Sequence, residues 1–439
     1  MVGSEKEGLA VFPRRLSSSW LLAMYVLAVG LTVPQLMYAA ATITVISGDD
    51  PGEGFNDPTS FTPVGGNNAT TLGQARLNAF RHAAGIWANL LTSSVEIQVE
   101  AAMDPLEPGV LGRAGPNTAH RDFPNAPAAQ TWYVQALANS LAGMDLAPTR
   151  ADISAQFSST FPFYLGFDGT PLPGEVDFVT VVLHELGHGL GFLSLVNLLT
   201  GSKLQGFDDA YMSSLELHGA NPANYPAMTD AQRIAASVAG PNLHWVGPQV
   251  VVASGTLTAG VGPGPHVQMF APNPAQPGSS VSHFTNIIHP DQLMEPALPP
   301  GVAIHDVGLA GPLLADLGWK INLQSVSLIC DIQLSQPVYD NGNVVTATTL
   351  RLANSGTATV PVELKIWIEG PGLAPISYAN VGADGSMQLP PGFNQNFGPV
   401  QLFTVTPEHP RGAYAFNCRL LDPITGASSF LDENPFTIR

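Results

Sequence analysis

The strongest constraint on this chain is the sequence His-Glu-Leu-Gly-His at residues 184–188, inside an apolar run from Val179 to Phe192. On an α-helix, side chains four residues apart lie on the same face, so His184 and His188 can bind one metal ion. Two imidazoles on one helix suit zinc, and the adjacent Glu185 can accept a proton from zinc-bound water. The alternative is a buried helix with two hydrogen-bonded histidines. The apolar context favours the metal, because buried polar groups are costly without a partner.

A zinc site of this kind needs a third protein ligand. The extended metzincin motif would place it at position 194, where this chain has Ser194, a poor zinc ligand. We therefore expect the third ligand farther along the chain. His283 is distinguished by its surroundings, since it follows a Gly-Ser-Ser turn sequence and precedes Met294 by eleven residues. The other histidines downstream are His218, His244, His266, His289 and His305. Of these, His289 and His305 are the next candidates, followed by a glutamate such as Glu216.

The combination of a distant histidine and a methionine in a tight turn resembles leishmanolysin-type metzincins, in which an insertion separates the third ligand from HExxHxxG. The resemblance covers roughly residues 42–320 in the order of elements and is specific at residues 184–192 and 279–296. It implies that His184, His188 and His283 hold Zn²⁺, that Glu185 is the general base, and that Met294 forms an apolar floor beneath the metal. The activity it implies is that of a zinc metalloendopeptidase acting on proteins or peptides through zinc-activated water.

Residues 42–322 are predicted to form this zinc metalloprotease domain, an α+β domain of zincin type with an insertion before the third ligand. A β-branched run begins at residue 42, apolar residues at helical spacing cover residues 71–91, and residues 95–101 alternate as in a half-buried strand. A closing helix is expected over residues 306–319.

Three further segments of this domain carry weaker signals. Residues 104–130 are rich in Pro, Gly and Ala and are expected to form a surface loop. Residues 152–160 are expected to be the edge strand beside the cleft, where residues 154–157 would pair with the substrate backbone. Residues 247–280 are expected to form strands and loops of a small subdomain.

Residues 323–439 are predicted to form an all-β accessory domain. Residues 362–368 and 414–420 alternate between polar and apolar side chains, and no helical period is present in this region. Several short strands over this length favour an immunoglobulin-like sandwich. Cys330 and Cys418 fall in an early and a late strand, and in an oxidising compartment they could form a disulfide; two buried thiols are the alternative.

Residues 1–41 have the layout of a secretory signal peptide, with Arg14 and Arg15, an apolar stretch from Trp20, and small residues at the expected cleavage site near Ala41. The mature protein is therefore expected to be secreted and to lack a membrane span. The alternative is an uncleaved N-terminal membrane anchor with the protein facing outside. The net charge of −18 argues against partners that are nucleic acids or anionic membranes.

A second function remains open at this point. The chain could be a secreted adhesion or binding protein with an inactive zincin core, whose C-terminal β-domain binds the ligand. The intact Glu185 argues against this alternative, because an inactive site has no need of a general base.

Overall fold

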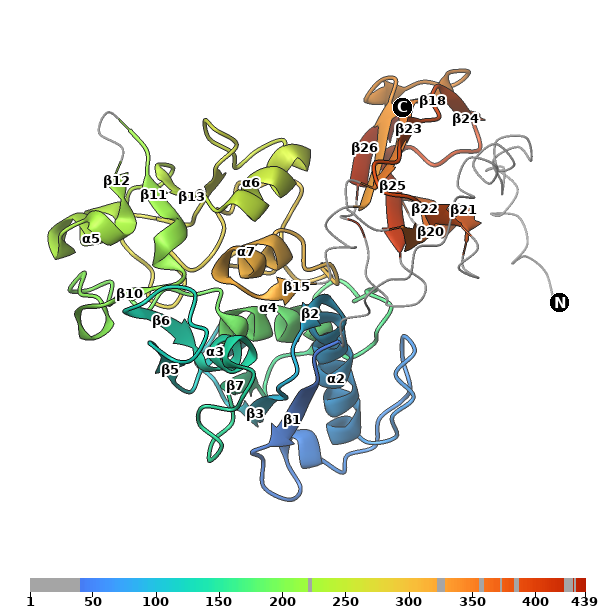
Figure 1. Cartoon of the computed structure of the whole chain (residues 1–439). Helices are drawn as coiled ribbons and strands as arrows, with labels where there is room; N and C mark the ends of the chain where they lie inside the picture. The colour runs from blue at the N-terminus through green and yellow to red at the C-terminus, as the bar shows by residue number, and fades with distance from the viewer. Residues whose placement is uncertain are drawn as a thin grey trace. The chain divides into compact units, whose positions relative to one another are not determined.

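The computed structural model describes residues 40–219, 223–321, 328–354, 359–371, 373–382, 387–421, 429 and 432–439. The protein is of mixed α+β class, as predicted. It divides into two compact units, of which one spans Tyr38–Ile321 and the other includes Asn322–Arg439 (Figure 1). The predicted signal peptide lies outside the described residues except for Ala40 and Ala41. None of the helices in the described ranges is long and apolar enough to cross a membrane.

A four-stranded sheet organises the first unit, in the order β1-β3-β7-β4. The strands β1 (Ile43–Ser47), β3 (Ile97–Asp104) and β7 (Ile153–Ser158) are parallel, and β4 (Gly112–Pro116) pairs antiparallel with β7 at the edge. Buried and exposed residues alternate along β3, as its sequence predicts. The helices α2 (Leu72–Leu90) and α4 (Phe178–Leu190) pack against each other, and α4 also contacts β4 and β7.

The position of the edge strand differs from the prediction. Residues 152–160 contain β7, which is an interior strand paired on both sides, so substrate cannot pair with residues 154–157. The edge is β4, which lies in the segment 104–130 that we expected to be a surface loop. Strand formation depends on pairing partners more than on intrinsic propensity, and the hydrogen bonds to β7 hold this Gly- and Ala-rich segment in a strand.

The two long helices begin and end where their sequences indicate. The Thr71 side chain accepts a hydrogen bond from the Gln74 backbone at the start of α2, and Asp177 accepts one from Thr180 at the start of α4. The helix α4 ends at Gly191, whose φ of +125° favours glycine. The Trp87 indole N–H of α2 donates to the Leu183 carbonyl of α4, which fixes one helix on the other.

A second sheet lies in the segment between α4 and His283. Its order is β12-β11-β13-β14, and all its pairings are antiparallel. These strands are β11 (Leu215–Leu217), β12 (Ala223–Asn224), β13 (Leu243–Trp245) and β14 (Val267–Gln268). The expectation of only strands and loops over residues 247–280 was wrong in one part, because Pro248–Ala253 forms the short helix α6, with proline in its first turn.

The remaining helices and short strands of this unit connect these parts. The closing helix is present as α7 (Ala310–Leu317), which ends at Gly318. The others are α3 (Gln135–Ala142), α5 (Asp230–Ala236), β2 (Leu91–Thr92), β5 (Ala119–His120), β6 (Thr131–Val134), β8 (Phe163–Tyr164), β9 (Val176–Asp177), β10 (Asp208–Asp209) and β15 (Lys320–Ile321).

Two larger sheets and one core make up the second unit. One sheet contains β16 (Leu328–Leu334), β18 (Val344–Asn354), β23 (Asn394–Asn396) and β24 (Val400–Thr404). The other contains β17 (Val338–Tyr339), β26 (Asp432–Ile438), β25 (Gly412–Leu421), β20 (Glu363–Gly370) and β21 (Leu373–Val381). A separate pair is formed by β19 (Val360–Pro361) and β22 (Gln388–Leu389). Apolar side chains from both larger sheets share one core, including Leu352 and Phe416.

A disulfide between Cys330 of β16 and Cys418 of β25 joins these two sheets, as the sequence analysis anticipated. We expect the Cys330→Ser/Cys418→Ser chain to lose on the order of 4 kcal/mol of unfolding free energy in this unit, because the bond closes a loop of 88 residues. Hydrogen exchange of residues 328–421 in rising urea measures the loss, and reduction of the unchanged chain should reproduce it. Equal protection in the variant and the oxidised chain would contradict the prediction.

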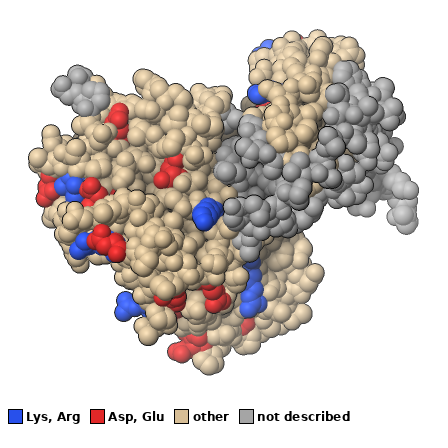
Figure 2. All heavy atoms as spheres, viewed as in Figure 1, with Lys and Arg blue, Asp and Glu red and all other residues tan. Residues whose placement is uncertain are grey.

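Charged side chains are sparse, since only 11% of the residues are Asp, Glu, Lys or Arg. On the face shown in Figure 2 the described basic side chains are scattered and are not gathered in one patch. The prediction that nucleic acid is not a partner therefore continues to rest on the net charge of −18.

Candidate metal centre

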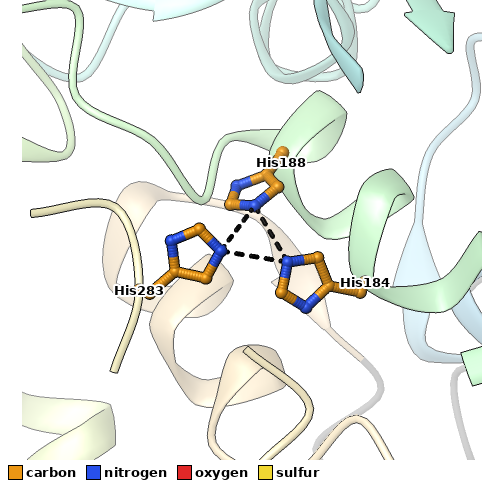
Figure 3. Close-up of side chains that lie close together, drawn as sticks. All are labelled: His184, His188 and His283. Atoms are coloured by element: carbon orange, nitrogen blue, oxygen red, sulfur yellow. Dashed lines mark hydrogen bonds between the residues drawn. The ribbon is translucent and has the colours of Figure 1, made fainter. Parts of the chain in front are cut away.

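The structure brings His184, His188 and His283 together, with their Nε2 atoms facing one another (Figure 3). The Nε2 atoms lie 3.0 Å apart between His184 and His283, 3.1 Å between His188 and His184, and 3.2 Å between His188 and His283. Ligand atoms about 2.0–2.1 Å from a tetrahedral zinc ion lie about 3.3 Å from one another. The spacing of the three nitrogens is therefore close to that expected for three ligands of one such ion.

The second ring nitrogen of each histidine shows which tautomer is present. The Nδ1 atoms of His184, His188 and His283 lie 2.8 Å from the carbonyl oxygens of Leu293, Phe192 and Ser279, in that order. A carbonyl oxygen only accepts, so each Nδ1 carries the proton and each neutral imidazole has a lone pair on Nε2. Three lone pairs that face one another cannot form hydrogen bonds among themselves. A cation between them resolves the repulsion, and backbone carbonyls that orient the ligands are usual at metal sites.

The protonation state of the trio also suits a metal. Burial lowers the pKa of His184, and it lowers the pKa of His188 to about 3, with a further contribution from His184. The pKa of His283 is lowered well below its usual value, first by burial and then by His188 and His184. All three imidazoles are therefore neutral at pH 7, which is the form that binds metal ions.

Glu185 lies beside the trio on the same helix and faces the edge strand. A methyl group at Gly112 of β4 would lie 3.0 Å from Cγ of Glu185 and 3.3 Å from its Oε1. Burial raises the pKa of this carboxyl to about 8, against a smaller lowering by a hydrogen bond from the Ala114 backbone. A nearby divalent cation favours the ionised form, so a bound metal would bring this pKa down.

Met294 is fully buried against the helix that carries the histidine pair. A methyl group at Gly187 would lie 2.8 Å from its sulfur, so the thioether packs against α4 at the residue before His188. The preceding residue, Leu293, supplies the carbonyl that accepts from His184. The Met294 carbonyl accepts from the backbone of Phe284, next to His283. This turn therefore links the helix to the segment of the third histidine.

A cleft of about 1330 Å³ opens onto the site. The cleft is lined on one side by residues 110–114, which include the start of the edge strand β4, and by His184, Glu185 and His188 of α4. The opposite wall consists of residues 277–283 and the segment from Asp291 to Ile304, interrupted by positions that do not line the cleft. The cleft is large enough for several residues of an extended peptide.

The other predicted ligands do not join the trio. His289 is exposed, and its Nδ1 lies 3.9 Å from a carboxylate oxygen of Asp291. His305 donates from Nε2 to Asp177 over 2.8 Å, and Glu216 lies near His218 and His266. Ser194 donates to Asp209 and does not occupy the place of a third ligand. The fallback assignments of His289, His305 and Glu216 to this centre are therefore wrong in this structure.

Sequence reasoning missed the residues of the edge strand that face Glu185. Gly112 lies close to Glu185 and the backbone of Ala114 lowers the pKa of Glu185, yet the composition of this segment predicts a loop. The available signal was the small residues Gly112, Ala114 and Gly115, because a strand that lacks bulky side chains at such positions allows another group to approach its backbone closely.

Gly189 explains why α4 can lie close to the sheet. A methyl group there would lie 2.5–2.9 Å from three side-chain carbons of Ile153 in β7. We expect Gly189→Ala to lower the free energy of unfolding by about 1–3 kcal/mol through overpacking. The matched control is Gly85→Ala in α2, where the methyl group meets no described atom within 4 Å and should stabilise the helix by about 1 kcal/mol. Thermal unfolding of both variants measures this, and equal shifts would contradict the expected difference.

Comparisons with known proteins add little evidence about function to the geometry of the site. The model of the family described as SPBPB7E8-like matches residues 104–216, less than a third of the chain. The matched segment includes β4, β7, His184, Glu185 and His188, and it ends before His283. No curated protein matches the chain at a significant level.

Matches among solved structures are weak. They include a Pseudomonas fluorescens alkylpurine DNA glycosylase, AlkC, bound to DNA with an abasic-site analogue, at 13% identity and a TM-score of 0.20, covering 30% of this chain and 39% of that one. Spo0M, a sporulation control protein from Bacillus subtilis, matches at 17% identity and a TM-score of 0.17, covering 26% of this chain and 49% of that one. A β-glucuronidase from Bacteroides uniformis matches at 21% identity and a TM-score of 0.16, covering 27% of this chain and 13% of that one. The chain thus spans less than half of each of these structures. TM-scores this low do not support a shared fold or function.

Proposed function

We propose that the protein is a secreted zinc metalloendopeptidase whose ligands are His184, His188 and His283. The observation that carries the proposal is the convergence of three unprotonated Nε2 atoms at 3.0–3.2 Å beside the carboxyl group of Glu185. The proposal also includes a zincin-like fold for the first unit and an immunoglobulin-like fold for the second. Three histidine ligands leave one position of a tetrahedral ion open, as catalytic zinc sites require.

Zinc, when bound, acts as a Lewis acid and lowers the pKa of water at the open position. The chain's own residues perform the remaining work. Glu185 accepts the proton of the attacking water and passes it to the amine of the departing peptide. The backbone carbonyls of Leu293, Phe192 and Ser279 hold the imidazoles in the required tautomer. Met294 excludes water from beneath the histidine pair, because its side chain is fully buried.

The substrate, in this proposal, is an extended peptide that adds to β4. One side of β4 pairs with β7, and the residues Gly112, Arg113 and Ala114 also line the cleft. Main-chain hydrogen bonds to an exposed sheet edge are a general way to hold a peptide independently of its sequence. This position places the scissile bond near Glu185, which approaches Gly112 closely.

The test is digestion of casein by the purified full chain. We expect cleavage that stops when a chelator removes the metal and returns when zinc is added. No cleavage by the zinc-loaded chain would reject the protease and leave the alternative, a binding protein with an inactive core. Cleavage that a chelator does not affect would also reject the proposed mechanism.

A further inference from the structure

A second group of potential metal ligands lies in the sheet of β11, β12, β13 and β14. Alternate residues of these strands point to opposite faces. One face carries Leu215, Leu243, Trp245 and Val267, which are buried. The register pairs Glu216 with His244 and His244 with Gln268, so these three lie on the opposite face. His218 and His266 stand two residues from Glu216 and Gln268 and share that face.

Three of these side chains converge. A carboxylate oxygen of Glu216 lies 3.2 Å from Nε2 of His218, and that nitrogen lies 3.0 Å from Nδ1 of His266. The three ligand atoms all lie within 4.8 Å of one another. The two short separations approach the distance of about 3.3 Å expected between ligands of one tetrahedral zinc ion.

Hydrogen bonding satisfies this contact only in part. Nε2 of His218 is close to both the Glu216 oxygen and Nδ1 of His266. A neutral imidazole nitrogen carries either one proton or one lone pair, so it forms one full hydrogen bond, with Glu216 or with His266, and serves both only through a weaker, shared three-centre bond. A metal ion serves all three atoms at once, with the carboxylate supplying negative charge and the imidazoles supplying lone pairs.

His244 packs against this cluster through its ring. It is 3% exposed, and its ring stacks on that of His218 with centroids 3.9 Å apart. Its Nδ1 donates to the Asn242 carbonyl, which leaves Nε2 as a buried acceptor with no hydrogen-bond partner among the described residues. This nitrogen faces Gly262, where a methyl group would lie 2.4 Å from it, and His244 is not one of the three grouped ligands.

We propose that Glu216, His218 and His266 form a second zinc site, distinct in all its ligands from the trio of the candidate metal centre. All three side chains are partly exposed, so water can complete the coordination. The role we assign to this site is structural. It ties the end of β11 to the start of β14, two segments that are 48 residues apart between His218 and His266.

The continuation of β14 connects this site to the third histidine of the first centre. Met269 donates to the Leu243 carbonyl of β13, and its backbone bridges to Phe284. Phe270 donates to the carbonyl of His283 over 2.9 Å. A metal that fixes β14 against β11 therefore also steadies the backbone that presents His283, so its removal should weaken the first centre indirectly.

The test is the zinc content of the full chain after dialysis, measured by mass spectrometry of the metal. We expect two zinc ions per chain, and one after His283→Ala, which disables only the first centre. His266→Gln, which keeps the side chain's bulk, should also leave one, and the double variant should bind none. His289→Ala is the matched control, since it removes an exposed histidine and should leave both ions bound.

Two results would overturn the second site. One is a His283→Ala chain that binds no zinc, a result that does not depend on whether the His266 variant folds. The other is a His266→Gln chain that binds as much zinc as the unchanged chain. If the first centre instead fails to bind zinc, His283→Ala will equal the unchanged chain at one ion and His266→Gln will bind none, so the two proposals are separated.

Discussion

Replacing Glu185 with Gln should lower kcat/KM for peptide cleavage by about a thousandfold, because general-base catalysis typically contributes 10²- to 10⁴-fold. The amide keeps the size of the side chain and its contact with Gly112 but cannot accept the proton of the attacking water. Glu185 is not among the three converging ligands, so the zinc content should not change. Loss of activity with zinc retained is the signature of a missing base.

Hydrolysis of a fluorogenic peptide and metal analysis on the same preparation measure both quantities. The matched control is Glu100→Gln, which removes an exposed carboxylate on β3 and should preserve kcat/KM. If Glu185→Gln retained full activity, the general base would have to be another group. If it lost zinc together with activity, Glu185 would be needed for metal binding, contrary to our assignment.

Replacing His283 with Ala should abolish proteolysis and release zinc from the first centre. The change removes one of three protein ligands, whereas loss of a group that only supports a ligand already costs 10- to 100-fold in metal affinity. We therefore expect the zinc affinity of this centre to fall by more than 100-fold. The neighbouring His184 and His188 remain on their helix but cannot hold the ion as tightly alone.

Competition with a chelator of known affinity measures this change. The titration is done in the His266→Gln background, so that only the first centre is counted. His289→Ala serves as the control and should leave the affinity unchanged, because that histidine is exposed and lies outside the trio. Unchanged zinc affinity in the His283 variant would show that the third ligand is another residue.

The sequence predicts the elements that depend on local signals. The helix that carries His184 and His188 ends at Gly191, a residue type that favours helix ends, and it begins after Asp177, whose side chain caps its first turn. The alternating residues of β3, β20 and β25 likewise become strands with one buried side. His283 was singled out by its short distance to Met294, and the structure brings both residues against α4.

The sequence does not predict features that depend on long-range pairing. The edge strand β4 has the composition of a loop, and only its hydrogen bonds to β7 make it a strand. The second cluster consists of residues that we first considered, one by one, as ligands of the first centre. Glu216 and His218 meet His266 because the antiparallel register of β11, β13 and β14 brings them to one face. The spacing of residues within one segment of the sequence cannot predict this contact, because its residues come from segments that are far apart in the chain.

The most direct test of the central claim is a crystal structure of the zinc-loaded chain with anomalous data collected at the zinc absorption edge. The account predicts an anomalous peak about 2.0–2.1 Å from the Nε2 atoms of His184, His188 and His283. A peak at another set of ligands, or none at this trio in a crystal grown with zinc, would contradict it.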